Sequence, residues 1–454
     1  MEKRAVFRGS FTQQEPIPAE AIEAAVGVLQ HGRLHRYNEA EGETAEAALL
    51  EEEFAEAMGA KHALAVASGG YALATALRAV GVQPGDPVLT NAWTLAPVPG
   101  AIAAVGGRSI FVEVNKSLVI DLDDLAARAA QNPAARVLLL SHMRGHIVDM
   151  GKLMAVAAAA NLCVVEDCAH TMGARWDGVL SGRHGRIGCY STQTYKHLNS
   201  GEGGLLITDD ADVMARAILL SGSYMLFEKH TAGPAAAAFE RARYTREMPN
   251  MSGRMDNLRA AILRPQLRNL RAQCEAWNDR YRAVEAGLRG TVGLTLVERP
   301  AKEDYVAVKW PYFLDLATMP VSLTLKKITI AVQLPVPAAG LAGRGGRTGR
   351  RGLRRAGGRA QVVRQARSTA RLHLTLRALG IRAAETNAAE RSCAGGRARH
   401  AAPADVHAGG LRADRPDCEG RSECGVARAA RGGAHCARDG HFEQAVVNPL
   451  SFVF

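Results

Sequence analysis

The stretches VVEDCAHTMGARWDG (164–178) and GRIGCYSTQTYKHLNSGEGG (185–204) decide how the fold is interpreted. The apolar residues before Glu166 and Asp167 are typical of a strand, so the pattern places a carboxylate at that strand's carboxyl end. Lys196 lies in a polar segment between two further apolar runs, close to Ser191 and to a Gly-Glu-Gly-Gly turn. The two stretches therefore predict a carboxylate at the carboxyl end of one strand and a lysine in a polar segment between two further strands.

Short apolar runs alternate with helical segments on both sides of these stretches. The expected strands are 63–67, 87–91, 109–114, 137–141, 162–166, 187–192 and 204–208. The expected helices are 18–32, 46–60, 71–81, 96–105, 121–130 and 150–161. This alternation predicts an α/β fold with a parallel sheet covered on both faces. Ligands in such sheets bind outside the carboxyl ends of the strands. Residues 255–289 are predicted to be helical, and 309–316 to begin a smaller domain's sheet.

The charge is distributed unevenly along the chain. The 454 residues carry a formal net charge of +11, yet the last lysine is Lys327. Residues 328–454 contain 21 arginines and 9 acidic residues, which leaves 35 basic and 36 acidic residues in 1–327. A basic surface that attracts nucleic acid is therefore not predicted for the first 327 residues.

Composition argues against several other classes of protein. Hydrophobic residues make up 47% of the chain, but no apolar run of 18 or more residues predicts a transmembrane helix. The first 18 residues lack the apolar segment of a secretory signal. Among the eight cysteines no CxxC pair occurs, and the histidines show no metal-ligand spacing, so no metal is predicted. We expect free thiols in a reducing cytoplasm.

A lysine, a carboxylate and a phosphate-binding turn are the groups that pyridoxal phosphate requires. The lysine forms a Schiff base with the aldehyde, and the carboxylate keeps the pyridine nitrogen protonated. A helix N-terminus binds the phosphate, and SGGY (68–71) supplies one between a predicted strand and a predicted helix.

These motifs resemble the DegT/StrS family of pyridoxal-phosphate aminotransferases over roughly residues 16–290. The resemblance implies the aspartate-aminotransferase fold (fold type I), with a mostly parallel large domain and a smaller C-terminal α+β domain. It also implies a homodimer with active sites at the interface. The expected divisions are a large domain at 1–250, the start of the small domain at 251–327, and an atypical tail at 328–454 that disrupts it.

The resemblance also implies roles for individual residues. Lys196 and Asp167 match the catalytic lysine and the carboxylate that pairs with the pyridine nitrogen. The remaining cofactor-binding candidates are His170 at the phenolic oxygen, Ser191, Gly69 and Gly70 at the phosphate, Trp93 against the ring, and Asn250 reaching across the dimer. The family usually has threonine at the position of Gly70, so backbone N–H groups would have to do more there. Asn250 lies four residues before Arg254, where the family spacing is two.

The implied activity moves an amino group from glutamate or glutamine to a keto-sugar or a cyclic ketone, as in polysaccharide or antibiotic biosynthesis. Family members that dehydrate sugars carry histidine in place of the lysine, so Lys196 favours transamination. One alternative is a dehydratase like aminohydroxybenzoate synthase. The other is an RNA-binding protein that acts through its basic tail.

Three explanations compete for residues 328–454. Arginine-glycine segments can bind single-stranded nucleic acid, but the aromatic residues that usually accompany them are nearly absent. The cysteines and histidines of the tail match no zinc pattern. Translation of GC-rich DNA in the wrong reading frame yields arginine, glycine and alanine without lysine or tyrosine, and this is the explanation we favour.

Overall fold

A seven-stranded sheet forms the centre of the structure, a computed structural model that describes residues 14–223, 225–242, 251–307 and 309–315. From edge to edge its strands are β1 (His62–Val66), β9 (Gly204–Thr208), β8 (Ile187–Ser191), β5 (Cys163–Asp167), β4 (Val137–Ser141), β2 (Pro87–Asn91) and β3 (Arg108–Val112). The pairs from β8 to β3 are parallel, whereas β9 is antiparallel to both β1 and β8. The mostly parallel sheet is confirmed; β9 runs antiparallel because residues 192–203 contain no crossover helix and the chain reverses there.

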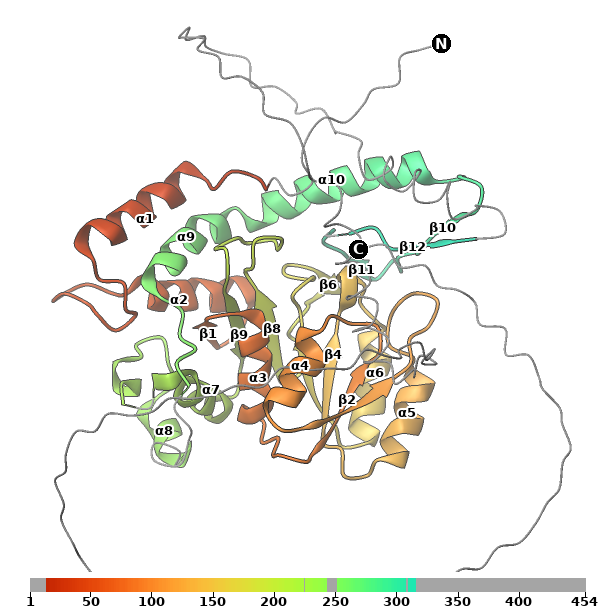
Figure 1. The fold of residues 1–454 in the computed structure, drawn as a ribbon, viewed down its shortest axis with the longest axis horizontal. Helices are drawn as coiled ribbons and strands as arrows, with labels where there is room; N and C mark the ends of the chain where they lie inside the picture. Colours follow the sequence, from red (N-terminus) through yellow and green to blue (C-terminus); the bar gives the residue numbers. More distant parts are fainter. Residues whose placement is uncertain (1–13, 224, 243–250, 308, 316–454) are drawn as a thin grey trace, which may run out of the picture. The chain divides into compact units, whose positions relative to one another are not determined.

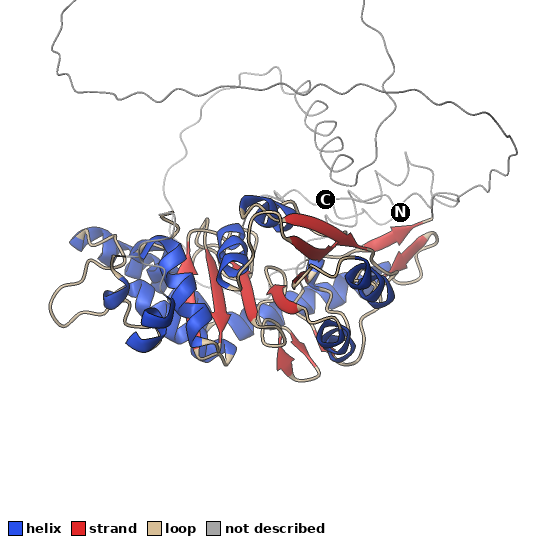
Figure 2. Cartoon of the chain, turned by 90° about the horizontal axis from the view of Figure 1, so that it is seen from below, coloured by secondary structure: helices blue, strands red, loops and turns tan. Residues whose placement is uncertain are grey.

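Helices cover both faces of this sheet (Figures 1 and 2). They are α1 (Ala19–His31), α2 (Glu46–Met58), α3 (Gly69–Ala79), α4 (Pro97–Ala104), α5 (Leu122–Gln131), α6 (Met150–Ala159), α7 (Ala211–Ile218), α8 (Ala236–Ala242), α9 (Asn257–Arg268) and α10 (Leu270–Leu288). Helices α3, α4 and α7 share one hydrophobic layer with the sheet, and α2, α5, α6 and α9 share the other. Along β4, Leu138 and Leu140 face one layer while Val137 and Leu139 face the other. Burial on both faces explains the continuous apolar runs, and the predicted α/β class is confirmed.

A smaller set of strands follows α10. β10 (Leu294–Leu296) pairs with β12 (Tyr312–Leu314), as expected for a second sheet near 309–316. β11 (Glu303–Asp304) pairs with β6 (Arg175–Trp176), which also pairs with β7 (Val179–Leu180). A domain boundary at 250 stays a prediction, and the tail from 328 lies outside the described residues. No helix among the described residues is both long and apolar enough to cross a membrane.

A buried ionic network joins the segment before α2 to the sheet. Arg36 and Glu51 are at most 2% exposed, and their side chains form two hydrogen bonds of 2.8 and 2.6 Å. The Glu51 carboxylate also accepts the backbone N–H of Ala65 in β1 at 2.7 Å and contacts His230 Nε2 at 3.1 Å. Tyr37 contacts His230 Nδ1 at 3.0 Å. The network therefore ties three segments distant in sequence to α2.

Glu51→Gln is expected to lower the free energy of unfolding by about 3–5 kcal/mol, because it leaves the Arg36 charge buried and uncompensated. Urea unfolding of the full chain measures this loss. The matched control is Glu43→Gln, which removes a solvent-exposed ion pair with Arg33 and should leave the free energy of unfolding nearly unchanged, because solvent screens such pairs. Equal losses in the two variants would contradict the importance of the network.

The same network gives this prediction a pH dependence. Burial acts to raise the pKa of Glu51, but the charges of Arg36 and His230 outweigh it and lower the pKa to about 2. Because the folded-state pKa is depressed from 4.5, the stabilisation is complete above pH 4.5 and is lost as the pH falls toward 2. The stability difference between wild type and Glu51→Gln should therefore shrink over that interval.

Candidate active site

The polar residues singled out in the sequence follow strands that end at one edge of the sheet. Ser141 of β4 lies opposite Asp167 of β5 in the parallel register. Ser191 at the end of β8 lies opposite Gly204 at the start of β9, which in turn lies opposite Val66 at the end of β1. The loops that carry Gly69, Asp167 and Lys196 therefore all leave the sheet from this edge, where ligands bind in α/β sheets.

Asp167 is partly buried and its carboxylate is held by two hydrogen bonds. The backbone N–H of Ala169 donates to Oδ1 at 3.1 Å, and Ser141 Oγ donates to Oδ2 at 3.1 Å. Burial raises the pKa of Asp167, while the Ala169 N–H, the nearby Lys196 charge and Ser141 oppose the shift. The carboxylate thus has a fixed orientation and a strong preference for a cationic partner.

Ser141 is a site residue that the sequence interpretation missed. Its hydroxyl accepts a hydrogen bond from Thr94 Oγ1 at 2.8 Å and donates one to Asp167 Oδ2. Its backbone is fixed by the Asn91 side chain, which bonds both its N–H and its carbonyl oxygen. Ser141 and Asn91 end the runs VLLLS and PVLTN, so a polar residue at a strand's carboxyl end was the available signal.

Lys196 lies in the turn between β8 and β9, where its backbone N–H donates to the Gln193 carbonyl oxygen at 2.9 Å. Its half-buried side chain lies within Coulombic reach of Asp167. Burial lowers the pKa of Lys196 to about 8; Asp167 opposes this shift, and Arg144 and Lys309 add to it. A neutral amine is therefore accessible near physiological pH, as a nucleophile or general base requires.

The N-terminus of α3 lies directly against Ser191. Ser68 caps the helix by accepting the N–H of Tyr71 at 3.1 Å. A Cβ added to Gly69 would lie 2.8 Å from the Ser191 Cβ, so only glycine permits this approach. At Gly70 the nearest atom to an added Cβ is 3.8 Å away, which leaves ordinary room. The result is a helix N-terminus with unpaired N–H groups beside a hydroxyl, which suits an anion such as phosphate.

Gly69→Ala and Gly70→Ala form a matched pair that tests this packing. Gly69→Ala should cost about 1–3 kcal/mol of stability through overpacking and should weaken uptake of pyridoxal phosphate. Gly70→Ala should leave stability unchanged or raise it by about 0.5–1 kcal/mol, because alanine is the better helix former. Urea unfolding and absorbance titration with pyridoxal phosphate measure both. Similar behaviour of the two variants would show that the contact with Ser191 is unimportant.

His170 and Trp93 lie in loops at the same edge. His170 is buried, and its Nδ1 accepts the backbone N–H of Arg144 at 3.1 Å. Burial and the charges of Lys196 and Arg144 lower its pKa far below the usual value, so the neutral ring carries its proton on Nε2. Trp93 is half-buried just after β2, where its carbonyl oxygen accepts a hydrogen bond from the Asn91 side chain. Asn250 lies outside the described residues.

A second buried cluster near the site is structural. His142, Glu166 and Cys168 have possible ligand atoms within 4.8 Å of one another. The Glu166 carboxylate, however, already accepts the N–H groups of Gly182, His184 and Gly185 and contacts His142 Nε2 at 3.0 Å. Burial also raises the pKa of Cys168 well above that of a free thiol. We therefore assign this cluster to the anchoring of the 182–185 loop.

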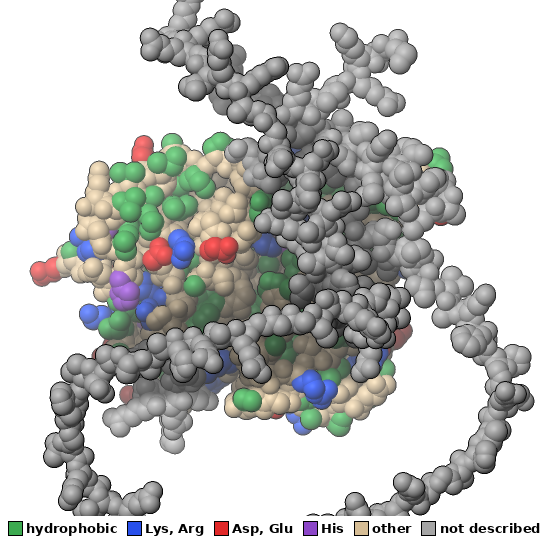
Figure 3. Space-filling view, in the orientation of Figure 1, with side chains coloured by type: hydrophobic (Ala, Val, Ile, Leu, Met, Phe, Trp, Pro, Cys, Tyr) green, Lys and Arg blue, Asp and Glu red, His purple; other side chains and the backbone are tan. Residues whose placement is uncertain are grey.

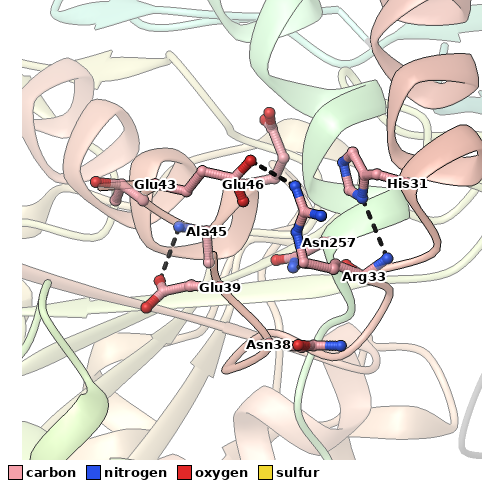
Figure 4. A pocket seen from close by; sticks show the side chains of 9 residues that line it. His31, Arg33, Asn38, Glu39, Glu43, Ala45, Glu46 and Asn257 are labelled. Carbon is pink, nitrogen blue, oxygen red and sulfur yellow. Dashed lines mark hydrogen bonds and ion pairs between the residues drawn. The ribbon is translucent and has the colours of Figure 1, made fainter. Parts of the chain in front are cut away.

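A polar pocket of about 200 Å³ lies apart from these residues, between the segment 31–46 and Asn257 (Figure 4). Its polar groups bond one another: Glu39 accepts the N–H of Ala45 at 2.8 Å, and Arg33 pairs with Glu43. Asn257 donates to the carbonyl oxygens of Arg33 and His35. The pocket is thus a solvated surface hollow that shapes the chain before α2.

The sheet order and the residues at its carboxyl edge define the fold type I class of aminotransferase folds. The chain belongs to the DegT/DnrJ/EryC1/StrS aminotransferase family, whose model matches residues 17–333.

Individual relatives agree with this assignment. The chain is 32% identical over 289 residues to a dTDP-3-amino-3,4,6-trideoxy-alpha-D-glucose transaminase from Streptomyces venezuelae, covering 62% of this chain and 69% of the relative. It is 31% identical to an L-glutamine:2-deoxy-scyllo-inosose aminotransferase from Streptomyces lividus, covering 59% and 64%. The crystal structure of a 3-amino-5-hydroxybenzoic acid synthase matches with a TM-score of 0.58 at 26% identity, covering 67% of this chain and 76% of that one. For other curated relatives the matched share falls to 39% of their length.

Proposed function

We propose that this chain is a pyridoxal-phosphate-dependent aminotransferase that moves an amino group from glutamate or glutamine to a keto-sugar or a cyclic ketone. The observation that carries the proposal is that Lys196 lies within electrostatic reach of Asp167, whose carboxylate is held by Ser141 and Ala169 at one edge of the sheet. The glycine-only contact between Gly69 and Ser191 adds a phosphate cradle at that edge. Family membership and the names of the relatives support the same reaction class.

The residues present suit the cofactor. Pyridoxal phosphate, when bound, supplies an aldehyde that reacts with amines and a ring that accepts electrons. Lys196 would bind the aldehyde, Asp167 the ring nitrogen, and Ser191 with the α3 N-terminus the phosphate. His170 presents an Nε2–H donor suited to the phenolic oxygen, and Trp93 is proposed to stack on the ring. Gly70 contributes backbone N–H groups in place of a hydroxyl.

Lys196 and Asp167 have different roles: Lys196 transfers a proton, and Asp167 stabilises positive charge. With a pKa of about 8, the Lys196 Nζ can accept a proton from a substrate carbon and return it within the physiological pH range. Asp167, oriented by Ser141 and Ala169, would hold the ring nitrogen of the cofactor and favour its protonated form. The buried neutral His170 stays a hydrogen-bond donor and does not compete for the proton.

A second candidate is a dehydratase related to aminohydroxybenzoate synthase. It is favoured by the structural similarity to such a synthase at 26% identity. The names of the two aminotransferase relatives, one of which specifies L-glutamine, favour the transaminase. An RNA-binding function would depend on the tail, which lies outside the described residues.

We propose a homodimer in which α1 contributes to the interface. Ile22, Val26 and Leu29 lie three and four residues apart on α1 and are each more than 40% exposed. Figure 3 shows hydrophobic side chains gathered over this helix. Such a stripe on one helix face is typical of a surface that packs against another chain. Analytical ultracentrifugation of the full chain tests this proposal. We also keep as a proposal that Asn250 reaches across the dimer to the phosphate.

We keep the division into domains at 1–250 and 251–327, and a cytoplasmic location, as proposals. The family match ends at residue 333, six residues after Lys327. This supports a reading-frame change near that point as the origin of the tail. Resequencing the gene through the codons for 315–335 tests it, and one uninterrupted frame there would refute it.

The function is tested by an absorbance spectrum of the purified chain with pyridoxal phosphate, followed by a screen for amino acceptors. The screen pairs glutamate and glutamine with nucleotide-linked keto-sugars and inososes, and product analysis separates transamination from dehydration. Salt-sensitive RNA binding without cofactor absorbance would instead favour the RNA-binding alternative.

A further inference from the structure

Arg144 has an unusual backbone close to the proposed site, next to His170. It lies in the short helical turn η1 (Met143–Gly145), directly after β4 and Ser141. Its φ of 59° and ψ of 18° fall in the left-handed region that favours glycine. Strained residues of this kind concentrate at binding and catalytic sites, where the side chain has a use that offsets the strain.

The turn is held in place from two sides. The backbone N–H of Arg144 donates to His170 Nδ1 at 3.1 Å, and Arg299 donates to the Gly145 carbonyl oxygen at 2.9 Å. A Cβ added to Gly145 would lie 3.0 Å from the His170 carbonyl oxygen and 3.2 Å from that of Val306. The position of Arg144 is therefore fixed by packing, independently of its own guanidinium.

The charge of that guanidinium is not balanced. Unlike Arg36, which pairs with Glu51, the half-buried Arg144 forms no ion pair with any carboxylate of the described residues. Its charged neighbours include two lysines, since the charge of Arg144 lowers the pKa values of both Lys196 and Lys309. Burial also lowers the pKa of Arg144 itself. Partly buried cations of this kind, gathered together, create a positive potential that a bound anion would relieve.

We propose that Arg144, with Lys309 beside it, binds an anionic oxygen group of a substrate next to Lys196. The inference rests on the proposed function, because that function brings anions to this edge. The amino donor carries a carboxylate on the same carbon as its reacting amine, and a nucleotide-linked acceptor carries a diphosphate. A guanidinium suits both, since its planar N–H groups form paired hydrogen bonds with either group.

The test is the binding of two non-reacting probes to the protein loaded with pyridoxal phosphate. Glutarate stands for the donor carboxylate and inorganic pyrophosphate for the acceptor diphosphate, each titrated by calorimetry. Arg144→Gly and Arg144→Gln should weaken one of the probes about 10- to 100-fold, and Arg144→Lys should retain part of the affinity. The probe that is lost identifies the source of the anion. The control is Arg108→Gln, an exposed arginine at the amino end of β3, which should bind both probes as wild type does.

Two further readouts separate this role from others. Arg144→Gly relaxes the left-handed backbone, so its melting temperature should equal or exceed that of wild type. A lower melting temperature with unchanged probe affinity would show that Arg144 is a structural residue and would overturn the inference. Loss of pyridoxal phosphate uptake in the Arg144 variants would also overturn it. If wild type itself takes up no pyridoxal phosphate, the proposed function fails. If wild type takes up the cofactor but wild type and Arg144→Gly bind each probe with the same affinity, only the inference about Arg144 fails.

Discussion

Lys196→Ala is expected to abolish both the visible absorbance of the cofactor-loaded protein and its turnover. That absorbance would arise from covalent attachment of the cofactor to Lys196, the lysine whose charge acts on Asp167. The loss of turnover should exceed about 10⁴-fold, because the variant lacks both the nucleophile and the general base. Absorbance titration with pyridoxal phosphate and a half-reaction with glutamate or glutamine measure the two effects.

The control for this variant is Lys116→Ala, which removes an exposed lysine from the loop after β3. It should match wild type in both measurements. Lys196→Ala should stay folded, because the Lys196 side chain is only half-buried and lies in a turn between two strands. Full activity in a folded Lys196→Ala would end the aminotransferase proposal.

Cofactor uptake should also depend on pH through the same amine. With a pKa of about 8, roughly a tenth of the Lys196 amines are neutral at pH 7 and roughly nine-tenths at pH 9. Because the neutral amine is the nucleophile, the rate of covalent uptake by cofactor-free protein should rise about tenfold over that interval and then level off. An ordinary lysine with a pKa near 10.5 would still be gaining rate above pH 9.

Much of the sheet was predictable because most of its strands are buried on both faces. The runs PVLTN, VLLLS and GLLIT coincide with β2, β4 and β9. The direction of β9 was not predictable in this way, since an apolar run carries no sign of its orientation. That direction depends on residues 192–203, whose turn bonds and lack of a helix appear only in three dimensions.

Some residues of the site were predictable from the sequence and others were not. Asp167 and Lys196 were singled out because they follow apolar runs in a characteristic order. Ser141 and Asn91 also end apolar runs, but nothing in the chain shows that β4 lies beside β5, so their contact with the Asp167 loop was missed. Arg144 was missed for a different reason. Its importance arises from a left-handed backbone and from the absence of a paired carboxylate among the described residues, neither of which leaves a local pattern.

Asp167→Asn is the second variant expected to have a large effect, and it should separate activity from stability. Asparagine keeps the shape, and its amide can still accept the Ala169 N–H through its oxygen while donating to Ser141 Oγ. It cannot hold a positive charge on the ring nitrogen, so turnover should fall by about 10²–10³-fold. Cofactor absorbance should persist, because Lys196 is intact.

The stability of the same variant should move in the opposite direction. Burial raises the pKa of Asp167 in the folded protein, which means that the ionised carboxylate destabilises the fold at pH values above the folded-state pKa. Neutral asparagine removes that cost, so Asp167→Asn should melt at or above the wild-type temperature at pH 7, and the difference should shrink as the pH falls toward 3.8. A variant that lost stability along with activity would show that Asp167 is chiefly structural. Turnover is expected to fall while stability rises because the Asp167 carboxylate is oriented to bind a cationic ligand. Without that ligand, the charge of Lys196 compensates the buried carboxylate only in part.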